Sequence, residues 1–291
     1  MVGVQNEICQ SAAALAEMVP RLRAELDSAG FSSVKIHMAN ATNLNIGSDF
    51  CRVHQEAGVW PLIDYAAVNQ YDLQGCFTDL DRSDSIFKNW RDASQGKAFL
   101  STELCINNSH YQLPFYAVAL CMGQIYHKNL VLADAQAICY CWLLLSLPQP
   151  SFAWSRTLCT VDNRNGFIPA STSHQLRVFG AYSRHVHRGM VRVEADSSDS
   201  DLLATAFVDD RSQLQTIVLL NRASTACEIT LDGVEGPLPI VELVDQYHSN
   251  TQAPELQRME GESLKVTVPP GALVTLSSVP LLQVPDGFTP P

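Results

Sequence analysis

Short apolar runs alternate with helical patterns up to about residue 188, and this order constrains the fold more than any other feature of the chain. The expected strands lie around Val2 and Val4 and at Val34–Met38, Leu62–Val68, Lys97–Glu103 and Ala137–Leu145. The expected helices are Ser11–Gly30, Cys51–Ala57, Ser85–Ser94, Phe115–Tyr126 and Thr172–Arg188. Five strand–helix units in βαβα order predict a parallel sheet with helices outside it.

Local signals set the ends of two of these helices. Gly30 should stop the first helix, and Pro20 should kink or restart it. Thr172 and Gln175 have the spacing of a capping box, which predicts that the last helix starts at Thr172. Gly189 should end that helix.

The pattern changes after Gly189, where short and often alternating runs replace the helical periodicity. Turn signals such as Asp209-Asp210 and Pro269-Pro270-Gly271 separate them. The runs are Val191–Val193, Leu202–Val208, Thr216–Asn221, Cys227–Leu231, Ile240–Val244, Leu264–Val268 and Leu273–Leu276. An antiparallel β-sandwich is expected. The predicted domains are therefore 1–188, 189–282 and a Pro-rich tail at 283–291.

Composition narrows the function classes. Apolar residues make up 46% of the 291, enough to form a core, and the net charge is −11. A nucleic-acid-binding protein would need a basic face, so we expect no nucleic-acid partner. The longest apolar run, Ala137 to Pro148, is shorter than the roughly 20 residues of a membrane-spanning helix. No transmembrane segment is expected.

The nine cysteines are odd in number and contain no CxxC pair. Buried apolar thiols are therefore favoured over zinc ligands or a complete set of disulfides. Two glycosylation sequons, Asn40-Ala-Thr42 and Asn107-Asn-Ser109, give a weak indication of secretion.

Glu7 and Glu103 both stand at the carboxyl ends of expected strands. In a (β/α)₈ barrel catalytic side chains gather at that face, and a barrel of ~250 residues has about 31 residues per unit. The two glutamates are 103 − 7 = 96 residues apart, or about three units. They should then lie close together across the barrel mouth. Two carboxylates in that arrangement suit glycoside hydrolysis.

Several stretches resemble glycoside hydrolase family 30, a retaining family with a (β/α)₈ barrel and an attached β-sandwich. Val4-Gln5-Asn6-Glu7 is similar to that family's fourth-strand motif, and Leu100-Ser101-Thr102-Glu103 to its seventh-strand motif. Residues 178–192 are similar to the passage from the last helix to the sandwich, and 208–221 and 266–276 to sandwich strands. The resemblance implies that Glu7 is the general acid/base and Glu103 the nucleophile.

The resemblance also implies substrate-binding residues and shows departures. Asn6 matches an Asn that binds the sugar 2-hydroxyl, Tyr71 a site tyrosine and Trp142 an eighth-strand tryptophan. Trp154, in the loop after the eighth strand, is the best further candidate for stacking on a sugar. Where the family has Pro, His and Pro, this chain has Ile8, Asn69 and Arg188.

The resulting hypothesis is a secreted retaining β-glycosidase acting on a β-linked oligosaccharide, polysaccharide or glycolipid, without a metal or organic cofactor. If Glu7 ends strand four, this chain carries about strands 4–8 and lacks roughly 95 residues of barrel. The alternative is a truncated or inactive fragment that at most binds carbohydrate. A generic α/β interaction protein would leave the spacing of the two glutamates unexplained.

Other polar and aromatic residues are not expected to form sites. His185 and His187 are two apart and share no helix face, which argues against a metal pair. The acidic loop Asp79, Asp81 and Asp84 lacks the Gly and Glu of a calcium loop, so a solvated loop is expected. Core packing is expected for two tryptophans, Trp60 and Trp90.

Overall fold

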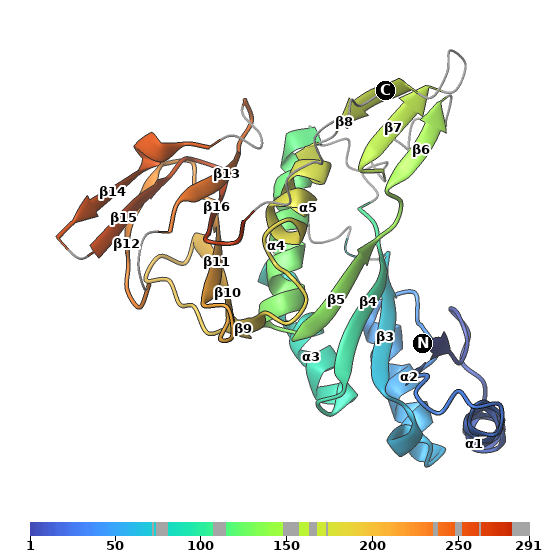
Figure 1. The fold of residues 1–291 in the computed structure, drawn as a ribbon. Coiled ribbons are helices and arrows are strands. Elements are labelled where there is room, and N and C mark those ends of the chain that lie inside the picture. The colour runs from blue at the N-terminus through green and yellow to red at the C-terminus, as the bar shows by residue number, and fades with distance from the viewer. Residues whose placement is uncertain are drawn as a thin grey trace. The chain divides into compact units, whose positions relative to one another are not determined.

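The structure is a computed structural model that describes residues 1–71, 73, 81–106, 115–147, 157–162, 168–172, 174–234, 238–247, 252–261 and 263–280. The chain divides into two compact units, Met1–Thr172 and Ser173–Pro291. Figure 1 shows the first with its helices beside a parallel sheet and the second rich in antiparallel strands. The expected tail at 283–291 lies outside the described residues.

The first unit is built on a five-stranded sheet. Its strands are β1 (Val2–Gly3), β2 (Ile36–His37), β3 (Tyr65–Gln70), β4 (Ala98–Leu104) and β5 (Ala135–Tyr140). They pair in chain order β1-β2-β3-β4-β5, and every pairing is parallel. The predicted parallel sheet is confirmed. Because every pairing is parallel, the carboxyl ends of all five strands lie at one edge of the sheet, and Figure 1 shows β3, β4 and β5 pointing the same way.

Helices connect these strands. They are α1 (Ala12–Ser28), α2 (Leu44–Glu56), α3 (Asp84–Ser94) and α4 (Phe115–Val131), with short 3₁₀ turns at Trp60–Leu62 and Asp81–Ser83. The side chains of Ser11 and Asn43 cap α1 and α2 by accepting hydrogen bonds from backbone N–H groups. α1 does not restart at Pro20, which is exposed, so that water can reach the carbonyl group that loses its donor there.

The core of the first unit forms where α2 packs on β3 and α3, and α4 packs on β5. Trp90 is fully buried and meets Phe99 edge-on, with ring centroids 5.0 Å apart. Trp60 is buried too, so the core positions expected for both tryptophans are confirmed. Gly47 of α2 lies against Trp90: a Cβ there would be 2.7 Å from the indole ring. This glycine lets α2 approach the sheet closely.

A buried histidine fixes the carboxyl end of β2. The Nδ1 atom of His54 lies 2.7 Å from the Phe50 carbonyl oxygen, and its Nε2 accepts a hydrogen bond from the Ala39 N–H at 3.4 Å. These contacts place the proton on Nδ1 of a neutral ring. Burial lowers the pKa of His54 below its usual value of 6.5, although the Phe50 carbonyl favours the charged form.

The predicted strand Ala137–Leu145 is two strands in two sheets. β5 ends at Tyr140, and β6 (Leu144–Leu147) joins β7 (Cys159–Asp162) and β8 (Ile168–Thr172). The pairing changes because the Cys141 N–H still bonds to Leu104, whereas the carbonyl groups of the next two residues accept from Leu158 and Cys159.

The helix predicted from Thr172 to Arg188 is shorter than expected. Thr172 is the last residue of β8, and α5 spans His174–Ser183. Gly189, with φ of 102°, lies in a turn after the helix. α5 packs on β13 and β16 and so belongs to the second compact unit. The sequence pattern predicts a domain boundary after Arg188 instead.

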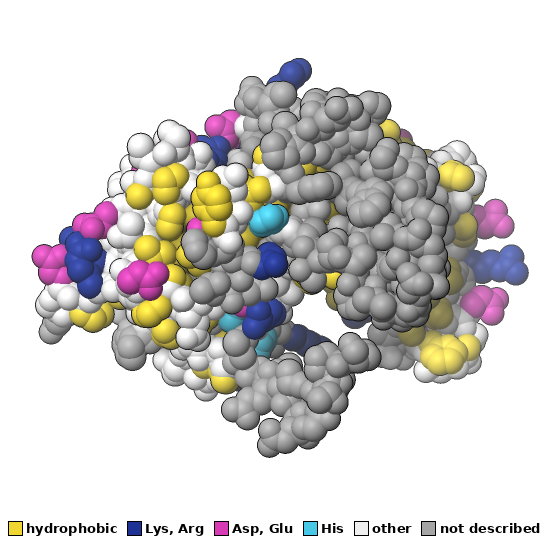
Figure 2. Space-filling model, turned by 90° about the horizontal axis from the view of Figure 1, so that it is seen from above, with side chains coloured by type: hydrophobic (Ala, Val, Ile, Leu, Met, Phe, Trp, Pro, Cys, Tyr) yellow, Lys and Arg dark blue, Asp and Glu magenta, His cyan; other side chains and the backbone are white. Residues whose placement is uncertain are grey.

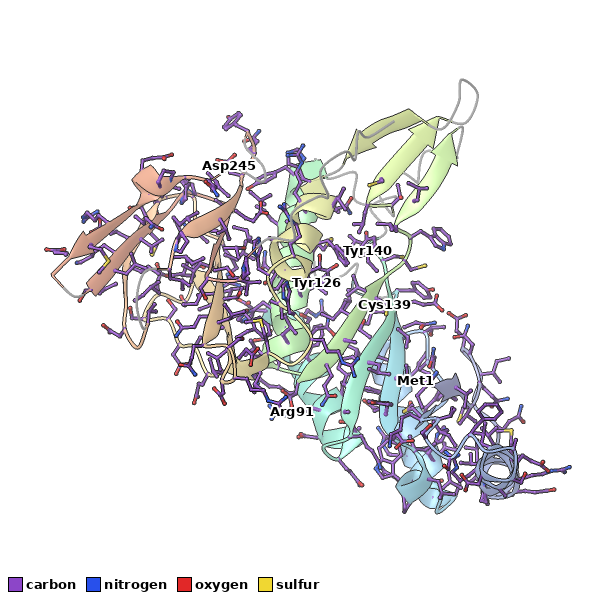
Figure 3. All side chains as sticks on the ribbon, in the orientation of Figure 1. Met1, Arg91, Tyr126, Cys139, Tyr140 and Asp245 are labelled. Carbon is purple, nitrogen blue, oxygen red and sulfur yellow. The ribbon has the colours of Figure 1, made fainter. Side chains whose placement is uncertain are left out.

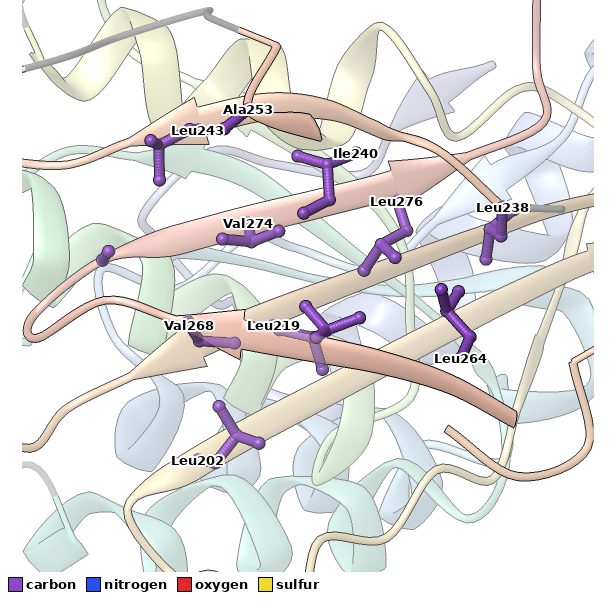
Figure 4. Close-up of a cluster of buried hydrophobic side chains, with 12 residues drawn as sticks. Leu202, Leu219, Leu238, Ile240, Leu243, Ala253, Leu264, Val268, Val274 and Leu276 are labelled. Atoms are coloured by element: carbon purple, nitrogen blue, oxygen red, sulfur yellow. The ribbon is translucent and has the colours of Figure 1, made fainter. Parts of the chain in front are cut away.

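The second unit contains two antiparallel sheets, as predicted. The first has the order β13-β16-β11-β10-β9 and the second β12-β15-β14. The strands are β9 (Val191–Val193), β10 (Leu202–Asp209), β11 (Leu214–Asn221), β12 (Cys227–Leu231), β13 (Ile240–Val244), β14 (Gln257–Glu260), β15 (Ser263–Val268) and β16 (Leu273–Ser277). Figure 4 shows Leu219, Leu264 and Val274 from both sheets in one buried cluster.

Two surface features complete the description. No helix in the described part of the chain is long and apolar enough to cross a membrane. On the face in Figure 2, the coloured acidic and basic side chains are scattered among hydrophobic ones.

Candidate active site

Polar side chains follow the strands at the carboxyl edge of the parallel sheet. Asn6 and Glu7 come after β1, Asn40 after β2, Asn69 and Tyr71 at the end of β3, Glu103 in β4, and Trp142 after β5. In α/β folds this edge is where ligands bind. The five expected residues that the structure describes (Asn6, Glu7, Tyr71, Glu103 and Trp142) therefore lie at one edge. Trp154 lies outside the described residues.

Glu7 is held in a left-handed backbone conformation, with φ of 60°. Its N–H donates to the Asn40 carbonyl oxygen at 2.8 Å, and the Asn40 N–H donates to the Gln5 carbonyl oxygen at 2.9 Å. A non-glycine residue in this region of φ/ψ space is strained by about 1–3 kcal/mol and persists only where its surroundings hold it. Such strain is concentrated at functional sites.

Asn69 connects the segment of Glu7 to that of Glu103. Its side-chain NH₂ donates to Glu7 Oε1 at 3.1 Å, and its side-chain oxygen accepts from the Thr102 hydroxyl at 2.9 Å. Asn69 is also the register partner of Glu103 between β3 and β4. Glu7 therefore bonds to a fully buried amide, and the residue that carries this amide pairs with Glu103 between β3 and β4.

Tyr71 donates a hydrogen bond from its hydroxyl to Oε2 of Glu103. Burial, together with this hydrogen bond and the charge of Glu103, raises the pKa of Tyr71 above its usual range. The phenol therefore stays protonated and acts as a donor to the carboxylate. Glu103 is half-buried and Glu7 is exposed, so the two carboxyl groups have different surroundings.

The contacts of Asn40 were not expected from the sequence. Its side chain is 7% exposed and donates to the Asn6 side-chain oxygen at 3.3 Å. The signal was present, because Asn40 follows an expected strand as Glu7 and Glu103 do. Its burial also removes one indication of secretion, since the folded protein hides this sequon; Asn107 lies outside the described residues.

Trp142 follows β5, which neighbours the strand of Glu103. Its side chain is 47% exposed. Figure 3 labels Cys139 and Tyr140 at the end of β5, which leads to this tryptophan. This partly exposed indole offers a flat apolar surface after β5.

The chemistry open to this arrangement is that of two carboxylic groups in unlike surroundings. One accepts from a neutral amide and the other from a phenol. A pair of this kind can divide the roles of proton donor and nucleophile. Within the described residues, no three His, Cys, Asp or Glu side chains are grouped to hold a metal ion.

The histidines and aspartates that could have formed metal sites have structural partners or are exposed. His185 is buried beside Glu242, with its Nε2 3.4 Å from Oε1, and His187 is exposed. Asp84 pairs with the buried ammonium group of Lys128 at 2.5 Å, so the acidic loop is not simply solvated there. Asp79 lies outside the described residues.

The cysteines are only partly as expected. No two of the eight cysteines in the described residues form a disulfide with each other, and Cys76 lies outside these residues. Three are buried, namely Cys51, Cys105 and Cys121, whereas Cys139 is exposed. Burial raises the pKa of the Cys51 thiol to about 12, as expected of an apolar thiol.

Comparison with known proteins identifies the fold. No protein-family model and no curated protein matches the sequence. The catalytic domain of GH30 xylanase C from Talaromyces cellulolyticus matches with a TM-score of 0.74 at 17% identity, over 95% of this chain and 61% of that one. A GH30 endoxylanase from Clostridium papyrosolvens matches at 0.65 and 14%, over 94% and 64%. A family 51 α-L-arabinofuranosidase from Bifidobacterium longum matches at 0.62 and 13%, over 95% and 66%.

The fold is that of glycoside hydrolase family 30 or a related clan A family. At these identities the likeness describes a glycosidase-like fold. The chain spans 61% of the length of the Talaromyces domain and 64% of the Clostridium enzyme.

Proposed function

We propose that this chain carries the catalytic pair of a retaining glycoside hydrolase that cleaves β-glycosidic bonds by double displacement. The observation that supports this most is the contact of Asn69 with Glu7, because Asn69 is the register partner of Glu103. Glu7, which follows β1, thereby bonds to a buried side chain of the residue that pairs with Glu103 of β4.

In the proposed mechanism Glu103 is the nucleophile. Its carboxylate attacks the anomeric carbon as the glycosidic bond breaks, and Glu7 gives its proton to the leaving oxygen. Glu7, now ionised, then takes a proton from water, which attacks the glycosyl-enzyme and releases Glu103. Tyr71 donates to Oε2 of Glu103, and we assign the attack to the other oxygen, Oε1.

The remaining site residues would bind the sugar. Asn6 would bond to the 2-hydroxyl, and the exposed indole of Trp142 would stack on the ring. Trp154 is proposed as a further stacking residue. We also propose that β1 to β5 correspond to about strands 4–8 of a (β/α)₈ barrel, in keeping with their parallel, sequential order.

The proposed substrate is a β-linked polysaccharide or glycolipid outside the cell. The structural neighbours include proteins named as GH30 xylanases and one named as a conserved exported protein from Bacteroides fragilis. A panel of β-xylosides, β-glucosides and β-galactosides would separate the sugar classes.

A mechanism-based inhibitor tests this function directly. A 2-deoxy-2-fluoro β-glycoside with a good leaving group should add its glycosyl mass to the peptide that contains Glu103. Glu103→Gln is the matched control and should take up no label. If a broad panel of such sugars labels nothing, the chain is at most a carbohydrate-binding protein, and the proposal fails.

A further inference from the structure

Asn69 is buried between two partners with opposite demands. Its NH₂ group faces Oε1 of Glu7 at 3.1 Å, and its oxygen faces the Thr102 hydroxyl at 2.9 Å. A carboxylate accepts hydrogen bonds, while a hydroxyl can donate one. An amide can bond to both partners at once, because it carries a donor and an acceptor on one carbon.

Glu7 decides which way the amide points. An ionised carboxylate only accepts, so turning the amide over would set an oxygen against Glu7, whereas the Thr102 hydroxyl can either donate or accept. With the NH₂ group toward Glu7, the hydroxyl on β4 donates to the amide oxygen and anchors it. Glu7 itself lies in a short exposed segment, so this contact is what connects its carboxyl group to the sheet interior.

We propose that Asn69, anchored by Thr102, is a positioning residue that holds Glu7 by one oxygen and leaves the other to exchange the proton. This rests on the proposed function. The NH₂ group can donate to Oε1 whether Glu7 is protonated on Oε2 or ionised, so the contact persists through both displacement steps. The Asn69 amide is not an ionisable group, so it offers the same donor in both steps.

Leaving-group dependence separates positioning from a structural role. General acid–base catalysis contributes roughly 10²–10⁴-fold, and a good leaving group needs little of it in the first step. In Asn69→Ala the value of kcat/KM for a phenyl β-glycoside should fall about tenfold further than for the 2,4-dinitrophenyl analogue. An equal fall for both substrates would mean that Asn69 only supports the fold, and would overturn the proposal.

Two neighbours on β4 provide the comparison variants. Thr102→Val removes the hydroxyl that anchors the amide oxygen. It should lower kcat/KM for the phenyl glycoside more than for the 2,4-dinitrophenyl analogue, by a smaller factor than Asn69→Ala does. Ser101→Ala is the matched control, since the buried Ser101 hydroxyl has no hydrogen-bond partner among the described residues. Ser101→Ala should preserve the ratio of the two kcat/KM values. A changed ratio in Ser101→Ala, or an unchanged ratio in Thr102→Val, would count against the positioning role of Asn69.

A spectroscopic measurement makes the two proposals separable. In ¹⁵N-labelled protein the side-chain NH₂ signals of Asn69 are those missing from Asn69→Ala. Glu7→Gln and Thr102→Val should each shift them, whereas Ser101→Ala should not. Unshifted signals in Glu7→Gln overturn the positioning role even in an active enzyme. The signals could shift in both variants while the wild-type protein neither hydrolyses the glycosides nor is labelled by them. That result would overturn the proposed function, and the catalytic role of Asn69 with it.

Discussion

At the scale of single residues, the proposed site depends on side chains that act in pairs. Tyr71 has a raised pKa because burial and Glu103 both disfavour its phenolate, so the phenol remains a donor to the carboxylate. Hydrogen bonds to charged groups contribute about 1.5–3 kcal/mol. The effect of a substitution at such a position should therefore be measurable in catalysis without loss of the fold.

Tyr71→Phe tests this pair. We expect kcat/KM to fall roughly ten- to hundredfold, because Glu103 loses the donor that orients it. The measurement is steady-state hydrolysis of an aryl β-glycoside. Tyr247→Phe, which changes a tyrosine that is 83% exposed in the second unit, should retain wild-type activity. Unchanged kcat/KM in Tyr71→Phe would refute a functional role for the contact.

His54 makes a second residue-scale prediction, on stability. Its folded-state pKa is lowered, so the unfolded chain takes up the proton first as the pH falls. The contribution of neutral His54 is complete above about pH 6.5 and is lost as the pH falls from there toward the folded-state pKa. Urea unfolding at pH 7.5 and 5.5 should show a smaller drop in the free energy of unfolding for His54→Asn than for wild type.

The exposed His187 supplies the control for that experiment. His187→Asn should show the same drop between the two pH values as the wild-type protein does. An identical drop in His54→Asn would contradict a neutral, buried His54.

At the scale of elements, close approach of α2 to the sheet depends on Gly47. A methyl group there would meet the buried ring of Trp90 at 2.7 Å and Val68 at 3.0 Å. Overpacking of this kind costs about 1–3 kcal/mol, against a gain in helix propensity of up to about 1 kcal/mol.

Gly47→Ala should therefore lower the free energy of unfolding, despite the better helix former. Thermal or urea unfolding followed by circular dichroism measures the change. Asn45→Ala, on the exposed side of the same helix, should stay within about 0.5 kcal/mol of wild type. A stabilised Gly47→Ala protein would show that α2 can shift without penalty.

The sequence predicted most elements of the parallel sheet because their apolar runs end abruptly in polar residues, as at Glu7 and Glu103. It did not predict the break between β5 and β6, because the run from Ala137 to Leu145 is apolar throughout and only the change of hydrogen-bond partner divides it. β14 (Gln257–Glu260) was missed for the opposite reason: three of its four residues are exposed, and it has no apolar alternation.

The same limit applied to the candidate site. The positions of Glu7 and Glu103 could be read from strand ends and spacing. The contact from Asn69 to Glu7 could not, because it joins residues 62 apart in the chain and depends on the register of two strands. In the sequence, Asn69 stands out only as a departure from the family pattern.

At the scale of the whole molecule, the proposed pair of glutamates predicts the stereochemistry of the reaction. If Glu7 and Glu103 act as proposed, their carboxyl groups should lie about 5–5.5 Å apart, and hydrolysis should retain the anomeric configuration. Proton NMR of the first product formed from a β-glycoside distinguishes the two outcomes. Release of the α-anomer first would indicate inversion and a separation of roughly 6.5–9.5 Å, and would refute the double displacement.

The burial of Asn40 affects how the protein can be produced. In a host that attaches N-glycans during translocation, the Asn40-Ala-Thr42 sequon is accessible only until the end of β2 pairs with the Gln5–Glu7 segment. Glycan transfer and folding would then compete for one side chain, and a sugar placed there would keep Asn40 from Asn6. A bacterial host avoids this competition, and Thr42→Val avoids it at Asn40 in a eukaryotic one.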